Sequence, residues 1–526
     1  MKVRSIVLPY AIALAVSCGG TDIVNDPVAV AGGRVQGQLV DEDIRVFRGI
    51  PYAAPPVGNL RWRPPQRVVP WEGLRDATAY GAECPQSPLP PTSIYARPEQ
   101  PQSEDCLFLN VWAPPPASAP LPVVVWIHGG DLTRGSGASD FGPDGSGIPF
   151  ARKGIVVVSL NHRLGALGYL AHPELSAESP EGVSGDYGLL DQIAALQWVR
   201  DNIAAFGGDP ARVTIAGQSG GAASVSALIA SPLARGLFAR AIGQSGGLFG
   251  PGVVLRDAPE GGVSAEDAGL EFARELLGSP PEESLRALRS APTDAVLRTG
   301  FVPRETVDGW VLPGDVPTMI RERRHNNVPV IVGSTADEAT ALVGPAYVPT
   351  TMGIYRERIT ARYGASAAAF EQAYPVGSEA EIASAMLGSM RDSTFTLPMR
   401  TWARLTSDAG ARAYLYFFAH PPPGPRSSEL GAFHGSEIPY IFDTLTSADA
   451  EDAVEYTSAD RELAERMSTY WANFIATGDP NSDGLPQWLP YDRNTEPYLL
   501  IGEAIEPATH LLKQQLDFLE GLPTTR

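Results

Sequence analysis

Short apolar runs alternate with helical patterns along most of the chain. Runs rich in valine, isoleucine and aromatic residues, without polar alternation, are typical of strands buried on both faces of a sheet. Strands alternating with helices predict an α/β fold with a doubly wound, mostly parallel sheet. The expected strands lie at 121–130, 154–163, 212–217, 240–246, 328–335 and 413–420, and the clearest helices at 187–208, 221–231 and 458–478.

The sequence also predicts the ends of the last helix, helical insertions and the number of domains. We expect Ser458 to cap the last of the three helices and Gly478 to end it. Helical patterns within 260–300 and 355–390 are interpreted as insertions or caps over the sheet. Length alone favours about three domains, but no proline-rich stretch is long enough to be a linker. We therefore predict one catalytic domain over 28–526.

The pentapeptide GQSGG occurs twice, at 217–221 and 243–247, and both copies fit the G-x-S-x-G pattern of a nucleophilic serine. Such a serine stands on a strained turn between a strand and a helix. Ser219 follows a strand and precedes a helix of small residues, whereas Ser245 is followed by GLFGPG, which disfavours a helix. Ser219 is therefore the predicted nucleophile.

A serine nucleophile needs a base and an orienting acid, and after an elbow of this kind the acid precedes the base in the chain. His434 lies in a glycine-flanked loop after the last long strand and is the predicted base. The strand at 328–335 is followed by Asp337 and Glu338, and the sequence does not separate these two carboxylates. The other histidines after the serine are His325, His420 and His510.

Backbone N–H groups that stabilise an oxyanion are predicted at two places. One belongs to Gly220, directly after the nucleophile, at the start of a helix. The others are expected in the glycine-rich turn that follows an early strand, within 123–137.

Charge and composition exclude several classes of partner. The 526 residues include 60 acidic and 40 basic side chains, for a net charge of −20. A surface this acidic repels phosphate backbones, so no nucleic acid partner is expected. Seven histidines and three cysteines show no zinc-binding spacing, so we predict no metal and no cofactor.

The N-terminus has the features of an export signal. Two basic residues precede an apolar run at 6–16, which is too short to span a membrane. Cys18 follows small residues, as in a bacterial lipoprotein, so we predict a signal peptide over 1–17, lipidation of Cys18 and a short linker over 18–27. An ordinary secretion signal is the alternative. Either way the protein is expected to be exported, with membrane contact only through a lipid anchor.

The two remaining cysteines, Cys84 and Cys106, are predicted to form a disulfide in an exported protein. The loop it closes is of a length that the chain-entropy model rates at roughly 3 kcal/mol. Two buried free thiols are the alternative.

Beyond single residues, the chain resembles the type-B carboxylesterases, the carboxylesterase/cholinesterase-like branch of α/β hydrolases that includes para-nitrobenzyl-esterase-like bacterial enzymes. The resemblance extends from about residue 33 to the C-terminal helices. It is carried by FRGIPYAAPPVGNLRWRPP (47–65), SEDCLFLNVW (103–112), WIHGG (126–130), SLNHRLGALGYL (159–170), GDYGLLDQIAALQWVRDNIAAFGGDPARVTIAGQSGGA (185–222), STADE (334–338) and HGSE (434–437).

The resemblance implies specific roles. The acid of such enzymes is usually the second carboxylate of the stretch, which favours Glu338. The oxyanion donors would be Gly130, Asp131 and Gly220, and Ser245 would lie beside the triad as a supporting hydrogen-bonding residue. The resemblance also implies the Cys84–Cys106 disulfide and an ion pair between Arg61 and Glu104.

Three departures from the family pattern bear on specificity. Asp131 replaces the usual Gly or Ala, so its carboxylate must point away from an oxyanion. Gln218 replaces a frequent Glu before the nucleophile. The loop from Cys84 to Cys106 has no Trp, whereas cholinesterases have their cation-binding Trp there, which argues against choline esters.

Together these features predict a serine carboxylic-ester hydrolase that works through an acyl-enzyme on a small-molecule ester, as a monomer or weak oligomer. The alternatives are a lipase acting on long-chain esters, cleavage of amides or carbamates by the same triad, and a catalytically dead cholinesterase-like binding protein.

Overall fold

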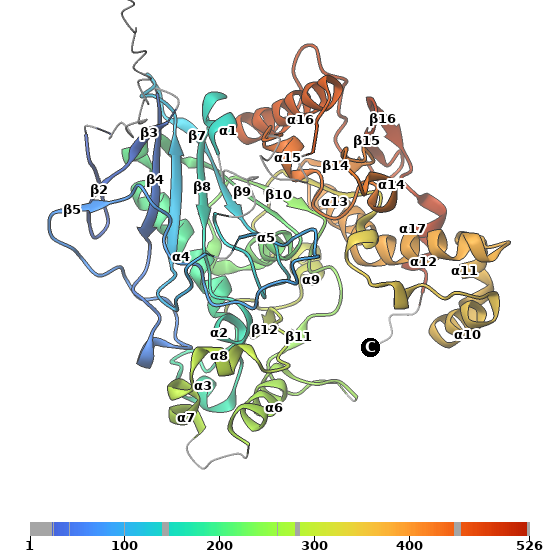
Figure 1. Ribbon diagram of the computed structural model, residues 1–526, viewed down its shortest axis with the longest axis horizontal. Helices are drawn as coiled ribbons and strands as arrows, with labels where there is room; N and C mark the ends of the chain where they lie inside the picture. The colour runs from blue at the N-terminus through green and yellow to red at the C-terminus, as the bar shows by residue number, and fades with distance from the viewer. Residues whose placement is uncertain are drawn as a thin grey trace, which may run out of the picture.

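An eleven-stranded sheet forms the centre of the computed structural model, which describes residues 24–522 apart from 25, 41–42, 99, 139–146, 260, 279–283 and 446–453 (Figure 1). The strand order is β16-β15-β14-β13-β10-β9-β7-β8-β6-β4-β3. The seven strands from β15 to β8 are mutually parallel, and the strands at both edges pair antiparallel. The predicted doubly wound sheet is confirmed.

All six predicted strands are present, with shorter or longer bounds than expected. They are β7 (Leu121–Ile127), β8 (Val156–Leu160), β9 (Gly208–Gln218), β10 (Arg240–Gln244), β13 (Val330–Thr335) and β14 (Ala413–Phe418). The edges add β3 (Gln38–Val40), β4 (Ile44–Pro51), β6 (Phe108–Ala113), β15 (Pro497–Ile501) and β16 (Ile505–Thr509). Smaller sheets contain β1 (Val28–Val30), β2 (Gly33–Gln36), β5 (Leu74–Asp76), β11 (Val253–Val254) and β12 (Thr306–Val307).

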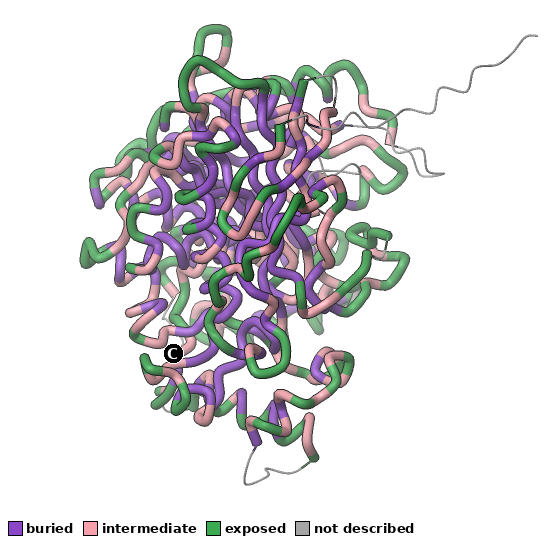
Figure 2. Tube along the Cα trace, turned by 90° about the vertical axis from the view of Figure 1, so that its left-hand side faces the viewer, coloured by how far each residue is buried: buried purple, intermediate pink, exposed green. Residues whose placement is uncertain are grey.

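The sheet is covered on both faces, which explains why its strands are apolar without alternation. Along β7, Val123 and Val125 belong to one apolar cluster, and Val124 and Trp126 to another. The first cluster includes α4 (Tyr187–Asn202), α5 (Gly220–Ala230) and α13 (Leu397–Asp408), and the second includes α1 (Ile148–Arg152), α15 (Ile438–Ile441) and α16 (Ser458–Thr477). Figure 2 shows the buried residues gathered in the centre of the molecule.

The predicted cap of α16 is wrong by one residue. Thr457 is the N-cap, because its hydroxyl accepts a hydrogen bond from the Asp460 backbone N–H at 3.2 Å while the Asp460 carboxylate accepts one from the Thr457 N–H at 2.8 Å. This reciprocal pair satisfies two N–H groups, which Ser458 could not do from inside the helix. Gly478 ends the helix with φ 81°, as expected.

The helical insertions form two groups, seen at the bottom and the right of Figure 1. The first contains α3 (Pro173–Glu178), α6 (Ala265–Leu277), α7 (Ser284–Ser290) and α8 (Thr293–Leu297). The second contains α10 (Met352–Tyr363), α11 (Ala367–Ala373) and α12 (Ile382–Arg391), which share a small apolar core of their own. The remaining short helices are α2 (Gly165–Tyr169), α9 (Val316–Arg321) and α14 (Ser427–Leu430).

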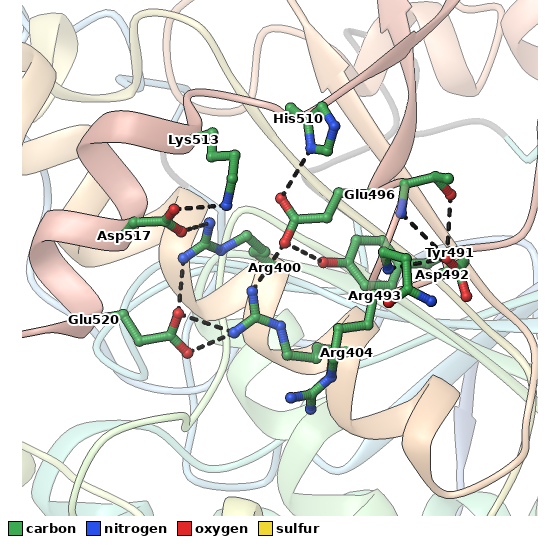
Figure 3. A network of polar contacts seen from close by, with 12 residues as sticks. Arg400, Arg404, Tyr491, Asp492, Arg493, Glu496, His510, Lys513, Asp517 and Glu520 are labelled. Atoms are coloured by element: carbon green, nitrogen blue, oxygen red, sulfur yellow. Dashed lines mark hydrogen bonds and ion pairs between the residues drawn. The ribbon is translucent and has the colours of Figure 1, made fainter.

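The C-terminal helix α17 (Lys513–Glu520) is held to α13 by the ion pairs of Figure 3. Arg400 donates to Asp517 at 2.8 Å and to Glu520 at 2.9 Å, and Arg404 donates to Glu520 at 2.6 Å. The network fastens α13, which follows directly on the π-helical turn Asp392–Thr396.

The expected disulfide between Cys84 and Cys106 is confirmed, and so is the ion pair of Arg61 with Glu104, whose Nε–Oε2 distance is 2.8 Å. Within the described ranges, no helix has both the length and the apolar character needed to cross a membrane. The predicted signal peptide (1–17) and Cys18 lie outside the described residues.

Candidate active site

Ser219 stands at the turn between β9 and α5, with φ 56°. This left-handed conformation is rare for a residue other than glycine and is typical of a strained functional turn. The turn is tight because the backbone approaches its neighbours closely: a Cβ atom on Gly221 would lie 2.1 Å from the Ile127 carbonyl oxygen. Glycine at this position is therefore a steric requirement of the elbow.

The second GQSGG contacts the backbone of Ser219 in the first. The Ser219 N–H donates to the carbonyl of Gln244 at 2.8 Å, and a Cβ atom on Gly246 would lie 2.3 Å from the Ser219 carbonyl oxygen. Both contacts come from the second pentapeptide, at the end of β10. It therefore packs against the turn that carries the first.

Ser245 itself is fully buried, with φ 49°, and its N–H donates to the Gly333 carbonyl at 2.8 Å. Its hydroxyl has no hydrogen-bond partner among the described residues, in contrast to the supporting hydrogen bond expected for it. The supporting role of Ser245 beside the triad stays a prediction.

His434 and Glu338 form a buried pair. His434 Nδ1 lies 2.5 Å from Glu338 Oε2, and Glu338 Oε1 accepts a hydrogen bond from the Thr335 N–H at 2.8 Å. Glu338 is 0% exposed and His434 6% exposed. Both carboxylate oxygens of Glu338 thus have a donor, and the pair has the geometry that fixes the tautomer of an imidazole and makes Nε2 its proton-accepting nitrogen.

The neighbouring carboxylate, Asp337, has a different contact. Its Oδ2 accepts from the Ala432 N–H at 2.9 Å, and its own N–H donates to the Ala432 carbonyl at 3.0 Å. Asp337 therefore holds the backbone of the loop two residues before His434, whereas Glu338 reaches the imidazole.

The other ring nitrogen of His434 contacts Gln218 in this arrangement. Gln218 Nε2 lies 3.2 Å from His434 Nε2, and the structure has this contact in place of a hydrogen bond to the Ser219 hydroxyl. Catalytic hydrogen bonds are often loose without substrate and tighten in the complex. The Phe395 ring, in the π-helical turn before α13, packs on the imidazole with centroids 4.8 Å apart.

The turn after β7 brings backbone N–H groups to the elbow. Gly130 and Asp131 both have positive φ, 109° and 52°, and the N–H groups of Thr133 and Arg134 donate to the Gly130 carbonyl at 3.0 and 3.2 Å. A Cβ atom on Gly220 would lie 3.0 Å from the Asp131 nitrogen, so the two residues predicted to donate are close neighbours. The side chain of Asp131 is exposed to solvent.

Two stacked histidines lie beneath this turn, a feature that the sequence did not reveal. The rings of His128 and His162 are 4.6 Å apart and nearly parallel, and both residues are buried. Burial lowers the pKa of His128 to about 4 and that of His162 to about 3, so both are neutral near pH 7. Two neutral rings pack together without charge repulsion.

The remaining candidate histidines have other partners. His420 Nε2 lies 2.7 Å from Asp460 at the start of α16, and His510 Nδ1 lies 3.6 Å from Glu496 in the C-terminal network. His325 is half-buried after α9. None of these contacts involves Ser219.

Glu437, three residues after His434, is a second buried carboxyl that sequence reasoning missed. It is 0% exposed, its Oε1 accepts from Gln244 Nε2 at 3.3 Å, and its Oε2 has no partner among the described residues. Burial, reinforced by the nearby Glu338 carboxylate, raises the pKa of Glu437 to about 7.

The raised pKa of Glu437 predicts a pH-dependent stability. The usual pKa is 4.5, so the folded protein keeps a proton between about pH 4.5 and 7 that the unfolded chain has lost. This contribution is fully present below pH 4.5 and is lost as the pH rises through about 7. Glu437→Gln, which cannot ionise, should therefore gain stability over wild type from pH 5 to pH 8, on the order of 3 kcal/mol.

Urea unfolding at pH 5 and pH 8 measures this difference. Glu506→Gln, an exposed position on β16, is the control and should show no such change. An equal stability difference between Glu437→Gln and wild type at both pH values would contradict the assignment.

Comparisons with known proteins identify the relatives of this chain. The profile of the carboxylesterase family matches residues 25–519. A fumonisin B1 esterase of Sphingopyxis macrogoltabida is 37% identical over 474 residues, which cover 88% of this chain and 84% of that protein. A para-nitrobenzyl esterase of Bacillus subtilis (strain 168) is 34% identical over 487 residues, with coverage of 90% and 94%, and carboxylesterase 5A of Felis catus is 34% identical over 505 residues, with coverage of 90% and 89%.

The match covers the central sheet, both groups of helices and every candidate site residue from Gly130 to His434. The expected family resemblance and fold class are therefore confirmed. The chain belongs to the carboxylesterase family of α/β hydrolases and is a carboxylic-ester hydrolase.

Proposed function

We propose that this esterase works through an acyl-enzyme, with Ser219 as nucleophile, His434 as base and Glu338 as the orienting acid. The observation that carries the proposal is the 2.5 Å contact of His434 Nδ1 with the buried Glu338 carboxylate, beside a serine on a strained elbow. The same three residue types in this relation are the working parts of serine hydrolases.

In acylation, the Ser219 hydroxyl attacks the ester carbonyl as His434 Nε2 takes its proton. The proton then passes to the leaving alcohol, and the acyl group stays on Ser219. In deacylation, water takes the place of the hydroxyl and His434 acts again in both roles. Glu338 keeps the imidazole in one tautomer and stabilises the imidazolium that forms in each half-reaction.

The oxyanion is stabilised by the backbone N–H groups of Gly130, Asp131 and Gly220. Gly220 is the first residue of the eleven-residue helix α5, whose N-terminus favours negative charge. An aspartate is compatible with this role because Asp131 is exposed to solvent while its backbone nitrogen lies close to Gly220. Besides the ester and water, the proposed steps use side chains and backbone groups of this chain, without a cofactor.

The substrate is proposed to be a small-molecule ester without a quaternary ammonium group. The relatives are named for a fumonisin B1 ester and a para-nitrobenzyl ester, which are suitable test substrates together with simple esters. The loop from Cys84 to Cys106 lacks the Trp that would bind a choline cation.

A series of p-nitrophenyl esters from acetate to palmitate, followed by stopped flow, tests this function. A rapid burst of one p-nitrophenol per enzyme, followed by slower turnover, supports an acyl-enzyme. Turnover without covalent labelling of Ser219 by a phosphonate inhibitor would refute the proposed mechanism. Activity confined to long acyl chains above their micellar limit would favour the lipase alternative over the small-ester assignment.

We further propose that the protein is exported and anchored by a lipid on Cys18. The disulfide between Cys84 and Cys106 supports export, since such bonds persist in oxidising compartments. Cys18→Ala is expected to release the protein from the membrane fraction and to abolish incorporation of labelled palmitate. A variant that still carries the label would contradict the anchor, and a wild type found wholly in the soluble fraction would favour ordinary secretion.

A further inference from the structure

Residues 83–97, here called the strap, connect the two sides of the proposed active site. They lie within or beside the loop closed by the Cys84–Cys106 disulfide, and Tyr95 is the midpoint of that loop, whose ends are 22 residues apart. The strap contacts Gly135 and Ser136, just after the turn of Gly130 and Asp131, at one end and the loop of His434 at the other.

The first end of the strap is held by buried polar contacts. Glu83 is 3% exposed and accepts hydrogen bonds from Ser136 Oγ at 2.7 Å and from Arg97 Nη2 at 2.9 Å. Gln86 exchanges two hydrogen bonds with the backbone of Gly135, at 2.9 and 3.0 Å. These contacts fasten the strap to residues just after the oxyanion turn, and the Arg97–Glu83 pair closes the strap on itself.

The second end reaches the base. The Tyr95 hydroxyl donates to the backbone carbonyl of His434 at 2.8 Å, across 339 positions of sequence. Tyr95 lies in a segment with two hydrogen-bonded turns. The Ser93 N–H donates to the Pro90 carbonyl at 2.9 Å, and the Ala96 N–H donates to the Ser93 carbonyl at 3.0 Å. Tyr95 as a whole is 36% exposed, while its hydroxyl is bonded to the carbonyl of His434.

The loop that carries His434 is flanked by Gly431 and Gly435, both with positive φ. Gly435 follows with φ 84°, a conformation that other residues rarely adopt. Glu338 holds the ring of His434, and Asp337 holds the backbone at Ala432. The Tyr95 hydroxyl contacts the backbone of the base residue itself.

We infer that Tyr95 is a positioning residue for His434, and that the disulfide-closed strap aligns the base with the oxyanion turn through this one hydrogen bond. The inference rests on the proposed role of His434 as base. A base displaced by a fraction of an ångström transfers protons more slowly. Ester binding should not change, because the Tyr95 hydroxyl is already bonded to the His434 carbonyl.

Tyr95→Phe tests the inference, since it removes the hydroxyl and keeps the ring. His434 serves both half-reactions, so the burst rate and the steady-state rate should fall by a similar factor, about tenfold, with little change in KM. Tyr470→Phe is the matched control. Tyr470 lies on α16, its hydroxyl also donates to a backbone carbonyl, that of Pro486, and removal of this hydroxyl should leave both rates unchanged.

Removal of the disulfide gives an independent test, made by substitution because both cysteines are buried. The double variant Cys84→Ala/Cys106→Ala should be slower than wild type by a factor similar to the loss in Tyr95→Phe. Adding Tyr95→Phe to it should slow it much less, because both changes act on the same contact. Unfolding temperatures measured alongside exclude a loss of folded protein as the cause.

Three results would overturn the inference: unchanged rates in Tyr95→Phe, a change confined to KM, or equal slowing by Tyr95→Phe with and without the disulfide. Different results would refute the inference and the proposed function. His434→Ala with normal activity would refute the function, whereas an inactive His434→Ala beside a fully active Tyr95→Phe would refute only the role of Tyr95.

Discussion

Ser219→Ala is expected to lower kcat/KM for p-nitrophenyl acetate by about 10⁴-fold or more and to abolish the burst. The alanine keeps the elbow, because Ser219 makes its structural hydrogen bond through its N–H to Gln244 and not through its side chain. The loss should therefore occur without a large fall in stability. Steady-state kinetics and thermal unfolding of the same sample measure both.

Ser245→Ala is the matched control, since the same substitution is made in an identical pentapeptide on the adjacent strand. Its hydroxyl is buried without a protein partner among the described residues, so we expect only a moderate loss, about two- to tenfold, with the burst retained. Loss of the burst in Ser245→Ala, together with its retention in Ser219→Ala, would reverse the assignment of the nucleophile.

Glu338→Gln is expected to lower kcat by about 10³- to 10⁴-fold. The amide is close in size to the carboxylate and can be accommodated in the same buried site, but it cannot stabilise the imidazolium by charge. If its NH₂ group faces the ring, it also favours the wrong tautomer of His434. The loss should appear in acylation and deacylation alike, as resolved by stopped flow.

Asp337→Asn distinguishes the two adjacent carboxylates. Asp337 accepts from the Ala432 N–H, and an asparagine can still accept there through its carbonyl oxygen, so kcat should change by less than about tenfold. A larger loss of kcat in Asp337→Asn than in Glu338→Gln would identify Asp337 as the orienting acid.

Much of the site could be predicted because its parts are local in sequence. A strand, glycines at the turn and a helix of small residues are neighbours along the chain, so VTIAGQSGGAASVSALIA predicts an elbow at Ser219 without knowledge of the rest. The same local rule separates Ser245, where GLFGPG follows. The cap of α16 was also readable from local sequence: Thr457 has Asp460 three residues later and forms a capping box with it, whereas Ser458 has Arg461 at that spacing.

The sequence pattern determined the sheet strands, the elbow and the family resemblance. Residue spacing did not decide whether Asp337 or Glu338 is the orienting acid, and the family resemblance only favoured Glu338. The tertiary structure alone decided which carboxylate reaches His434, that Gln218 contacts its Nε2, that Gly246 packs on Ser219 and that Tyr95 holds the His434 carbonyl. The physical reason is distance along the chain: strands and turns follow from neighbouring residues, whereas these contacts join segments up to 339 positions apart and exist only once the sheet brings them together.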